Sequence, residues 1–275
     1  MGRPRKIHVQ QDMLNLAGTK IRDPRGGKRA GAGRKPKGDR AGTPHRRRIA
    51  FRPSQPLHIS LKLLDVVGSL REMDIYAALQ KALTTTGKRT DMRIVHMSIQ
   101  DTHVHLLVEA DGKTALSRGM QGFKISAAKW INRALWERNG CRGKRRKGTV
   151  FADRYYCEVI ETPRQARFAL AYVLNNWRRH RLDRGEDEYK LLDKYSSAIR
   201  FDGWKERAGQ GRFACPAGYT ELNVWEPRTW LLREGWRRHG LISVYERPAH
   251  SLHAHIVRKL ARRAARVTQN ASATE

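Results

Sequence analysis

The segment from Thr102 to Glu109 constrains the fold of this 275-residue chain more than any other, because it alternates polar and core-type residues. Side chains alternate across a strand, so His103, His105 and Glu109 share one face and the aliphatic residues between them share the other. Two imidazoles side by side on a rigid backbone make half of a metal site. Two structural histidines at a strand edge explain this segment equally well, so the neighbouring elements must decide.

Two more segments show strand patterns. Residues 57–63 alternate strictly, with His58 on the polar face. Residues 92–99 are expected to pair with the segment at 102–109 as a hairpin, with Val95 on the apolar face. A sheet with one polar and one apolar face needs helices over its apolar side, so the fold class predicted is α+β, an antiparallel sandwich with helices on one face.

Two helices are predicted to provide this cover. The first runs from Ile75 to about Thr86, with Asp74 as its N-cap. The second runs over 114–138 and is expected to be interrupted at its two glycines, Gly119 and Gly122. Both carry an apolar stripe that can face the sheet.

A third helix has the clearest start signal in the chain. Thr162 is expected to be its N-cap, Pro163 its first residue and Gln165 the partner in a capping box. Tyr172 and Asn176 lie four residues apart and therefore share a stripe beside the core-facing one. A buried tyrosine with a neighbouring amide is the simpler explanation for this helix taken alone.

The formal net charge of +30 calls for a polyanionic partner, and nucleic acid is the first candidate. No segment has the length of a membrane span, and the three cysteines lack the spacing of a disulfide framework or a zinc site. We therefore expect no membrane association and a cytoplasmic, nucleoid-associated location.

The chain divides by composition into three parts. Residues 1–52 contain sixteen Lys or Arg against three Asp, and are expected to form a basic, largely disordered arm. Residues 53–183 are the expected ordered domain. Residues 184–275 are the expected C-terminal extension, rich in loops, with helices near 227–239 and 255–267.

Basic residues along the chain are candidates for contacts with phosphates, although those in the arm and in the loop at 138–147 are also explained by solvation alone. The candidates are Arg34, Lys35, Arg118, Lys124, Arg145, Arg146, Arg154 and Arg179.

A reaction becomes possible if the two histidines and the third helix meet. Asn176 would then offer a carboxamide oxygen as a third ligand, which leaves positions on the metal for a phosphate oxygen. Tyr172 would attack the phosphodiester and form a covalent phosphotyrosine. This linkage conserves the bond energy, so rejoining needs no nucleotide cofactor.

The motif His103-Val104-His105, followed by a helical tyrosine, resembles the HUH single-tyrosine nucleases. Three segments resemble the REP-associated tyrosine transposases: IVHMSIQDTHVHLLVEA at 94–110, FADRY at 151–155 and ALAYVLNN at 169–176. The resemblance covers about residues 53–181, and residues 227–240 resemble the C-terminal extension of a longer subgroup.

The resemblance implies a ferredoxin-like sheet with His103 and His105 as metal ligands, Asn176 as the third ligand and Tyr172 as the nucleophile. It also implies magnesium or manganese as the metal and palindromic hairpins in single-stranded DNA as the substrate. Two imidazoles suit manganese, cobalt or zinc at least as well as magnesium, so the residues alone leave the ion open.

Three functions remain in competition. The first is a metal-dependent endonuclease and transesterase of single-stranded DNA, similar to a transposase. The second is a hairpin-binding or regulatory protein that keeps the fold without catalysis. The third, a basic RNA-associated protein with structural histidines, explains the charge but not the joint occurrence of the histidines, Tyr172 and Asn176. Protein partners are unknown, and both a monomer and a homodimer are compatible with the sequence.

Overall fold

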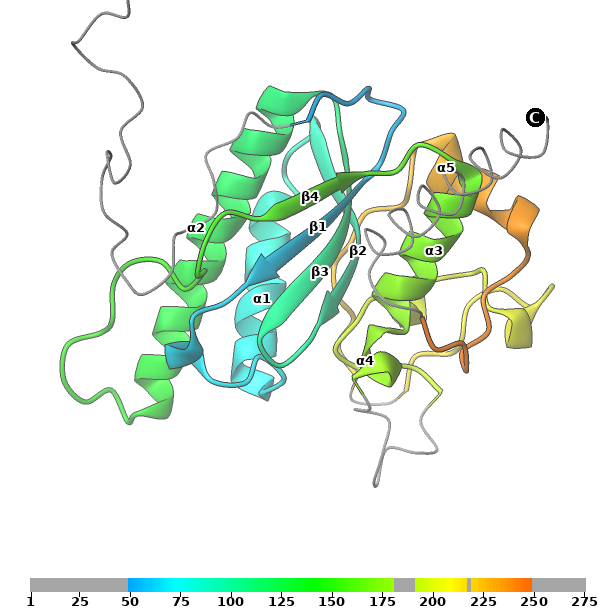
Figure 1. The fold of residues 1–275 in the computed structure, drawn as a ribbon. Helices are drawn as coiled ribbons and strands as arrows, with labels where there is room; N and C mark the ends of the chain where they lie inside the picture. Colours follow the sequence, from blue (N-terminus) through cyan, green and yellow to red (C-terminus); the bar gives the residue numbers. More distant parts are fainter. Residues whose placement is uncertain (1–48, 181–190, 217–218, 249–275) are drawn as a thin grey trace, which may run out of the picture. The chain divides into compact units, whose positions relative to one another are not determined.

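A sheet of four antiparallel strands lies at the centre of the computed structural model, which describes residues 49–180, 191–216 and 219–248 (Figure 1). The helices and strands are β1 (Leu57–Lys62), α1 (Met73–Thr86), β2 (Met92–Ile99), β3 (His103–Ala110), α2 (Lys113–Arg138), β4 (Tyr156–Val159), α3 (Pro163–Leu174), α4 (Asn176–Arg179) and α5 (Trp230–Arg233). Short 3₁₀ helices cover Asp65–Val67, Ala198–Arg200, Lys205–Arg207 and Gly235–His239.

The strand order is β2-β3-β1-β4, and the first six elements follow the sequence β1-α1-β2-β3-α2-β4. This is the ferredoxin-like α+β arrangement that we expected. Several predictions lie outside the described residues: Arg34, Lys35, almost all of the basic arm, and the helix at 255–267.

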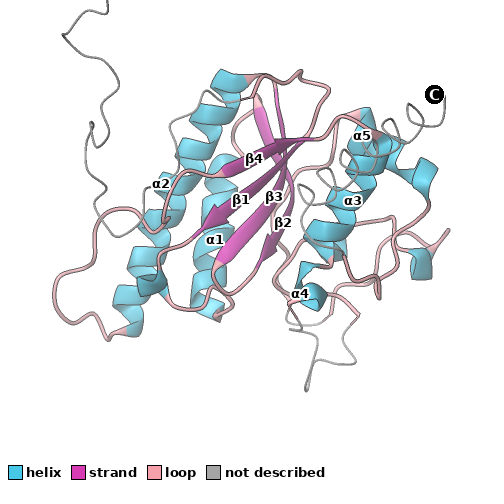
Figure 2. Cartoon of the chain, in the orientation of Figure 1, coloured by secondary structure: helices cyan, strands magenta, loops and turns pink. Residues whose placement is uncertain are grey.

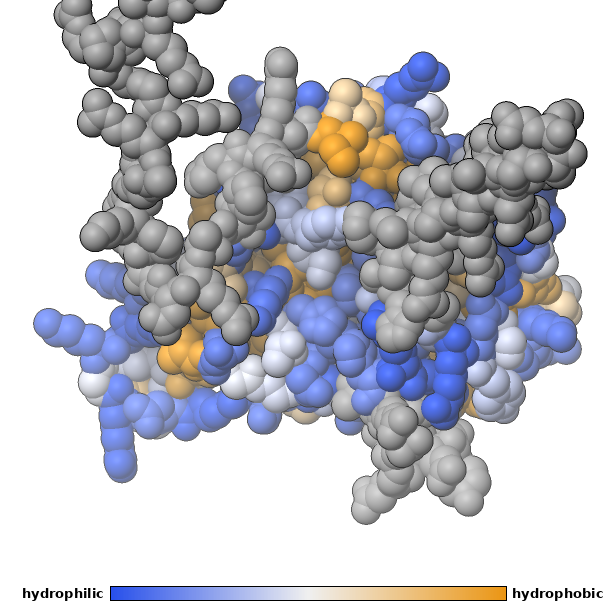
Figure 3. All heavy atoms as spheres, in the orientation of Figure 1, coloured by the Kyte–Doolittle hydropathy of each residue, from blue (hydrophilic) through white to orange (hydrophobic). Residues whose placement is uncertain are grey.

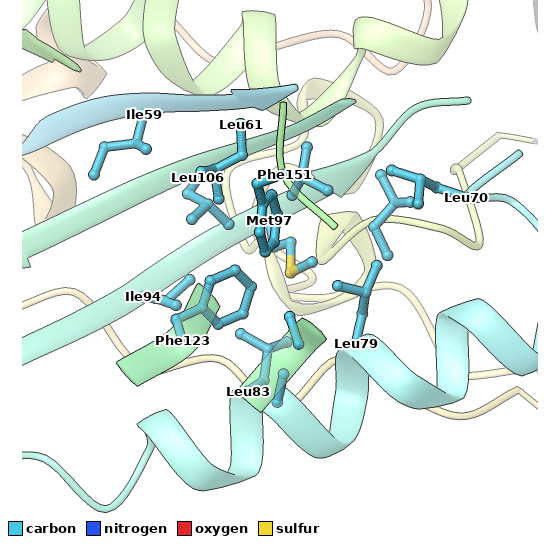
Figure 4. Packing of buried hydrophobic residues seen from close by; sticks show 14 of the residues in the cluster. Ile59, Leu61, Leu70, Leu79, Leu83, Ile94, Met97, Leu106, Phe123 and Phe151 are labelled. Carbon is cyan, nitrogen blue, oxygen red and sulfur yellow. The ribbon is translucent and has the colours of Figure 1, made fainter. Parts of the chain in front are cut away.

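Helices α1 and α2 cover one face of the sheet, as predicted, and the main hydrophobic core lies between them and the strands (Figures 1 and 2). Figure 4 shows this packing: Met97 of β2 and Leu106 of β3 point from the sheet toward Leu79 of α1. Phe123 of α2 closes the same cluster and is completely buried. The alternation along β1 and β3 builds much of this face.

The opposite face of the sheet is also covered, in part, by α3 and by the C-terminal extension (Figure 2). A second hydrophobic cluster forms there around Leu170 and Val173 of α3. Trp204 and Trp236 of the extension are buried in the same cluster. The extension therefore forms an outer layer that supports α3, with the helix at 227–239 replaced by the shorter α5 and a 3₁₀ turn.

Glu109 of β3 fixes the extension to the sheet. Its carboxylate is fully buried and accepts hydrogen bonds from the backbone N–H groups of Arg228 and Thr229, at 2.9 and 2.8 Å. It also accepts a hydrogen bond from Nε of Arg93 at 3.2 Å. These donors satisfy a buried charge that would otherwise be costly.

Helix α2 is continuous, so the predicted interruption at Gly119 and Gly122 is wrong. The reason is tertiary packing, because a Cβ atom at Gly119 would lie 2.3 Å from the sulfur of Met92. The glycine lets the helix approach β2, and the helix does not need to break there. The predicted cap of α1 is also wrong: the helix starts at Met73, and Asp74 lies inside its first turn.

A β-bulge in β2 moves Val95 to the face opposite the one predicted. Ile94 pairs with Val108, but the next paired residue, His96, faces Leu107. The extra residue shifts the alternation by one position, so Val95 packs in the second cluster together with Leu107. The alternation alone could not reveal this shift.

Candidate active site

The polar face of the sheet brings three histidines together. His103 and His105 alternate on β3, and their ring centroids are 4.7 Å apart. His58 of β1 lies beside His105, with 3.2 Å between Nε2 of His58 and Nδ1 of His105. One of these two nitrogens donates the hydrogen bond and the other accepts it.

Helix α3 places Tyr172 over this group. The Tyr172 ring contacts the rings of His105 and His58 edge-on, with centroid distances of 5.1 and 5.4 Å. Nη1 of Arg179 donates a hydrogen bond to the Tyr172 hydroxyl at 3.1 Å. The capping box of Thr162 and Gln165 fixes the start of α3, as the sequence predicted, and so sets the rotation of the helix.

Asn176 does not share a helix with Tyr172, contrary to the prediction of one continuous stripe. Helix α3 ends at Leu174, Asn175 leaves helical geometry, and Asn176 begins the short α4. The Asn176 side chain is completely buried, and neither its Oδ1 nor its Nδ2 has a hydrogen-bond partner in the described structure. A buried amide without partners is costly unless a ligand satisfies it.

Burial makes the histidines of this group neutral at physiological pH. Desolvation lowers the pKa of His58 and of His103 to about 4. Desolvation, with smaller contributions from His58 and His103, lowers the pKa of His105 well below its ordinary value. Neutral imidazoles keep the lone pairs that a metal ion needs.

These residues fit a divalent metal ion. Nε2 of His105 is buried and has no hydrogen-bond partner within the described residues, and its other ring nitrogen is held by His58. This arrangement is typical of metal-ligating histidines. In the described part of the chain no three His, Cys, Asp or Glu side chains converge to hold an ion.

Sequence reasoning did not assign His58 and His180 to the site. His58 was placed on the polar face, but its contact with His105 depends on which strands are neighbours. His180 follows α4, and its ring centroid lies 5.4 Å from that of His103. In the sequence His180 lies four residues after Asn176, but no local pattern indicates that it lies beside His103.

The predicted DNA-contacting residues of the described ranges lie in three places. Arg179 lies at the tyrosine, whereas Lys124, Arg145, Arg146 and Arg154 line a groove of about 790 Å³ between α2 and the loop that follows it. Lys129 and Lys147 line the same groove. Arg118 is exposed on α2 and does not line the groove.

Hydrophilic side chains project around the end of α2 and its following loop, at the lower left of Figure 3. Arg146 is held in place there by Asn132 and by the carbonyl of Thr149, at 2.7 and 2.8 Å. The groove is therefore a cationic surface with part of its charge fixed in position. None of the helices in the described ranges has the length and apolar composition that a bilayer crossing requires.

A ferredoxin-like sheet with strand histidines packed against a helical tyrosine defines this chain as an α+β protein with a histidine and tyrosine centre. Residues 69–176 match the family model described as Transposase IS200 like. This part of the chain is therefore similar to an IS200-like transposase domain. The matched range includes His103, His105, Tyr172 and Asn176.

A solved structure of a REP-associated tyrosine transposase bound to a REP hairpin is similar to this chain, with 13% sequence identity and a TM-score of 0.43. The similarity covers 68% of this chain and 99% of that one. A search of curated proteins found no match.

Proposed function

We propose that this protein is a metal-dependent endonuclease and transesterase of single-stranded DNA, which cleaves and rejoins DNA near palindromic hairpins. The observation that carries the proposal is the contact of the Tyr172 ring with His105, together with the hydrogen bond from Arg179 to its hydroxyl. The family match to IS200-like transposases supports the same class of reaction.

The nucleophile in this proposal is the Tyr172 hydroxyl. Its oxygen forms a bond to phosphorus, the bond from phosphorus to the 3′ oxygen breaks, and the tyrosine proton leaves while the 3′ oxygen becomes a hydroxyl. The products are a 5′-phosphotyrosine and a free 3′ end. The number of phosphoester bonds is unchanged, so the reverse attack by another 3′ hydroxyl rejoins DNA without a nucleotide cofactor.

His103, His105 and Asn176 would hold the divalent ion, which we propose to be magnesium or manganese. The ion supplies charge stabilisation at the phosphate oxygens when it is bound. Arg179 orients the hydroxyl of Tyr172 and adds a fixed positive charge beside the reacting phosphate. The groove at α2, with Lys124 and Arg146 in its wall, offers a second cationic surface for the DNA.

The test is the covalent adduct itself. The full chain is incubated with labelled single-stranded hairpin DNA, with Mn²⁺ or with EDTA, and the adduct is detected after denaturation. We expect an adduct that needs the metal and disappears in Tyr172→Phe. The control is Tyr245→Phe, because Tyr245 is an exposed tyrosine outside the site.

An adduct of unchanged yield in Tyr172→Phe would sink the assignment of the nucleophile. Hairpin affinity without cleavage in any metal would instead favour a regulatory DNA-binding protein that has kept the fold.

A further inference from the structure

A second tyrosine, Tyr156, lies on the same face of the sheet as the proposed centre. It is the first residue of the edge strand β4 and pairs with Ser60 of β1, which in turn pairs with His105. Residues directly opposite each other in antiparallel strands place their side chains on the same face. Tyr156 therefore belongs to the row of side chains that contains His105, two strand spacings or about 10 Å away along the sheet.

Tyr156 is unusual because it is a large aromatic side chain with 50% of its surface exposed. Helix α3 packs against β2 and β3, at the other end of this row. Two cations are close to the tyrosine in the chain or in the sheet. Arg154 comes two residues before Tyr156 and also lines the groove at α2, and Lys62 is the next polar-face residue of β1 after Ser60. Both cations are exposed.

Proteins that bind single-stranded nucleic acid combine aromatic side chains, on which bases stack, with basic residues that contact the backbone. Tyr156, Arg154 and Lys62 provide this combination at the open edge of the sheet. The core does not require an aromatic residue here, since Cys157 and Val159 are the residues of β4 that pack against the main core.

Tyr156 is poorly suited to act as a second nucleophile. Desolvation, followed by the charge of Glu158, raises the pKa of its hydroxyl. The raised pKa disfavours the charged form of the side chain, so the ring, and not the hydroxyl, is the part of Tyr156 suited to contact DNA.

We infer that Tyr156 is a stacking platform for a nucleobase of the single-stranded DNA, one that holds a nucleotide beside the phosphodiester presented to Tyr172. The inference rests on the proposed function, because it assumes that single-stranded DNA reaches the centre. Stacking tolerates any base, so the platform positions the strand and does not read its sequence.

Binding of a labelled oligothymidylate of about 20 nucleotides to the full chain, without metal and in the Tyr172→Phe background, tests the platform independently of cleavage. We expect Tyr156→Ala to weaken binding about 5- to 150-fold, and Tyr156→Phe to stay within about twofold because the ring remains. The matched control is Tyr245→Ala, which removes another exposed tyrosine, from the extension.

An oligonucleotide with an abasic position next to the cleavage point gives the sharper test. If Tyr156 stacks on that base, the abasic site and Tyr156→Ala each weaken binding, and the two together weaken it no further. Two results would overturn the inference that Tyr156 is a stacking platform. One is an equal loss of binding affinity in Tyr156→Ala and Tyr245→Ala, and the other is a fully additive loss of affinity when Tyr156→Ala and the abasic site are combined.

A metal-dependent adduct that persists in Tyr172→Phe and vanishes in the double variant with Tyr156→Phe would overturn the platform as well, since Tyr156 would then be a nucleophile. The oligothymidylate experiment needs no cleavage. Failure of the proposed reaction with an intact Tyr156 effect would therefore be distinguishable from failure of the platform.

Discussion

Arg179 and Tyr172 are seven residues apart, yet Nη1 of the arginine donates a hydrogen bond to the tyrosine hydroxyl at 3.1 Å. The guanidinium carbon also lies 5.5 Å from the centroid of the Tyr172 ring. The contact links α4 back to α3 across the break at Asn175. It places a fixed positive charge at the atom that we propose as the nucleophile.

The first prediction concerns this contact. Replacing Arg179 with alanine should slow adduct formation about 100-fold, because the hydroxyl loses its orienting donor and the reacting phosphate loses a nearby charge. Arg179→Lys should recover part of the rate, since it keeps the charge but loses the planar donor geometry. Single-turnover rates of adduct formation measure both effects.

Arg133→Ala is the matched control for Arg179, because Arg133 is an exposed arginine that pairs with Glu137 on the surface of α2. Rates that fall equally in Arg133→Ala and Arg179→Ala would mean that only overall charge matters.

The second prediction concerns His58, which holds Nδ1 of His105. Partners of this kind fix the orientation of a ligating histidine, and their loss typically costs 10- to 100-fold in metal affinity. His58→Ala should raise the Mn²⁺ concentration needed for half-maximal adduct formation by about this factor. His58→Gln, which retains a polar atom near Nδ1 of His105, should raise it less.

The exposed residue His239 supplies the control for His58. If His58→Ala and His239→Ala need the same Mn²⁺ concentration for half-maximal adduct formation, His58 does not position His105 for the metal, whatever happens to thermal stability.

Local patterns were sufficient to predict much of the fold. The hairpin of β2 and β3 is confirmed, and so is the capping box that starts α3, because both depend on residues a few positions apart. The bulge at Val95 and the unbroken α2 at Gly119 were predicted wrongly. The bulge is visible only in the pairing of β2 with β3, and the role of Gly119 only in its close approach to Met92, so neither could be predicted from the local sequence.

The candidate site, too, could be predicted only in part from the sequence. Strand alternation puts His103 and His105 on one face, and the sequence suffices for this. The contact between His58 and His105 depends on β1 lying between β3 and β4, a nonlocal pairing that no periodicity shows. The metal-binding and nucleophilic roles of these residues remain predictions that the experiments above test.

The third prediction concerns the stability of the extension. Glu109→Ala should lower the free energy of unfolding by about 3 to 5 kcal/mol, because it leaves Arg93 buried without its partner and removes the acceptor for two backbone N–H groups. Glu109→Gln should cost less, since it retains one carbonyl acceptor. Urea unfolding measures the loss, and limited proteolysis near residues 227–229 shows whether the extension is released.

Glu137→Ala removes an exposed carboxylate and serves as the comparison for Glu109. It should change stability by less than about 0.5 kcal/mol. A similarly small change in Glu109→Ala would show that the buried carboxylate does not hold the extension.

The fourth prediction concerns acid destabilisation through His96. Burial lowers the pKa of His96 to about 4, with Glu226 raising it and Arg212 and Arg200 lowering it by smaller amounts. Nδ1 of His96 lies 3.1 Å from the hydroxyl of Ser197. Since the unfolded chain binds a proton near the ordinary pKa of about 6.5, the contribution of His96 to stability is complete above that pH and is lost as the pH falls toward 4.

His96→Asn should abolish this contribution, because the amide can face Ser197 but does not titrate. The difference in unfolding free energy between the original protein and the variant should change with pH by at most about 1.4 kcal/mol per unit between pH 6.5 and 4. It should be flat above pH 7. Urea unfolding at several pH values in EDTA measures this difference, with the exposed His239→Asn as control. A difference that is flat across the whole range would show that His96 is not the buried neutral group described here.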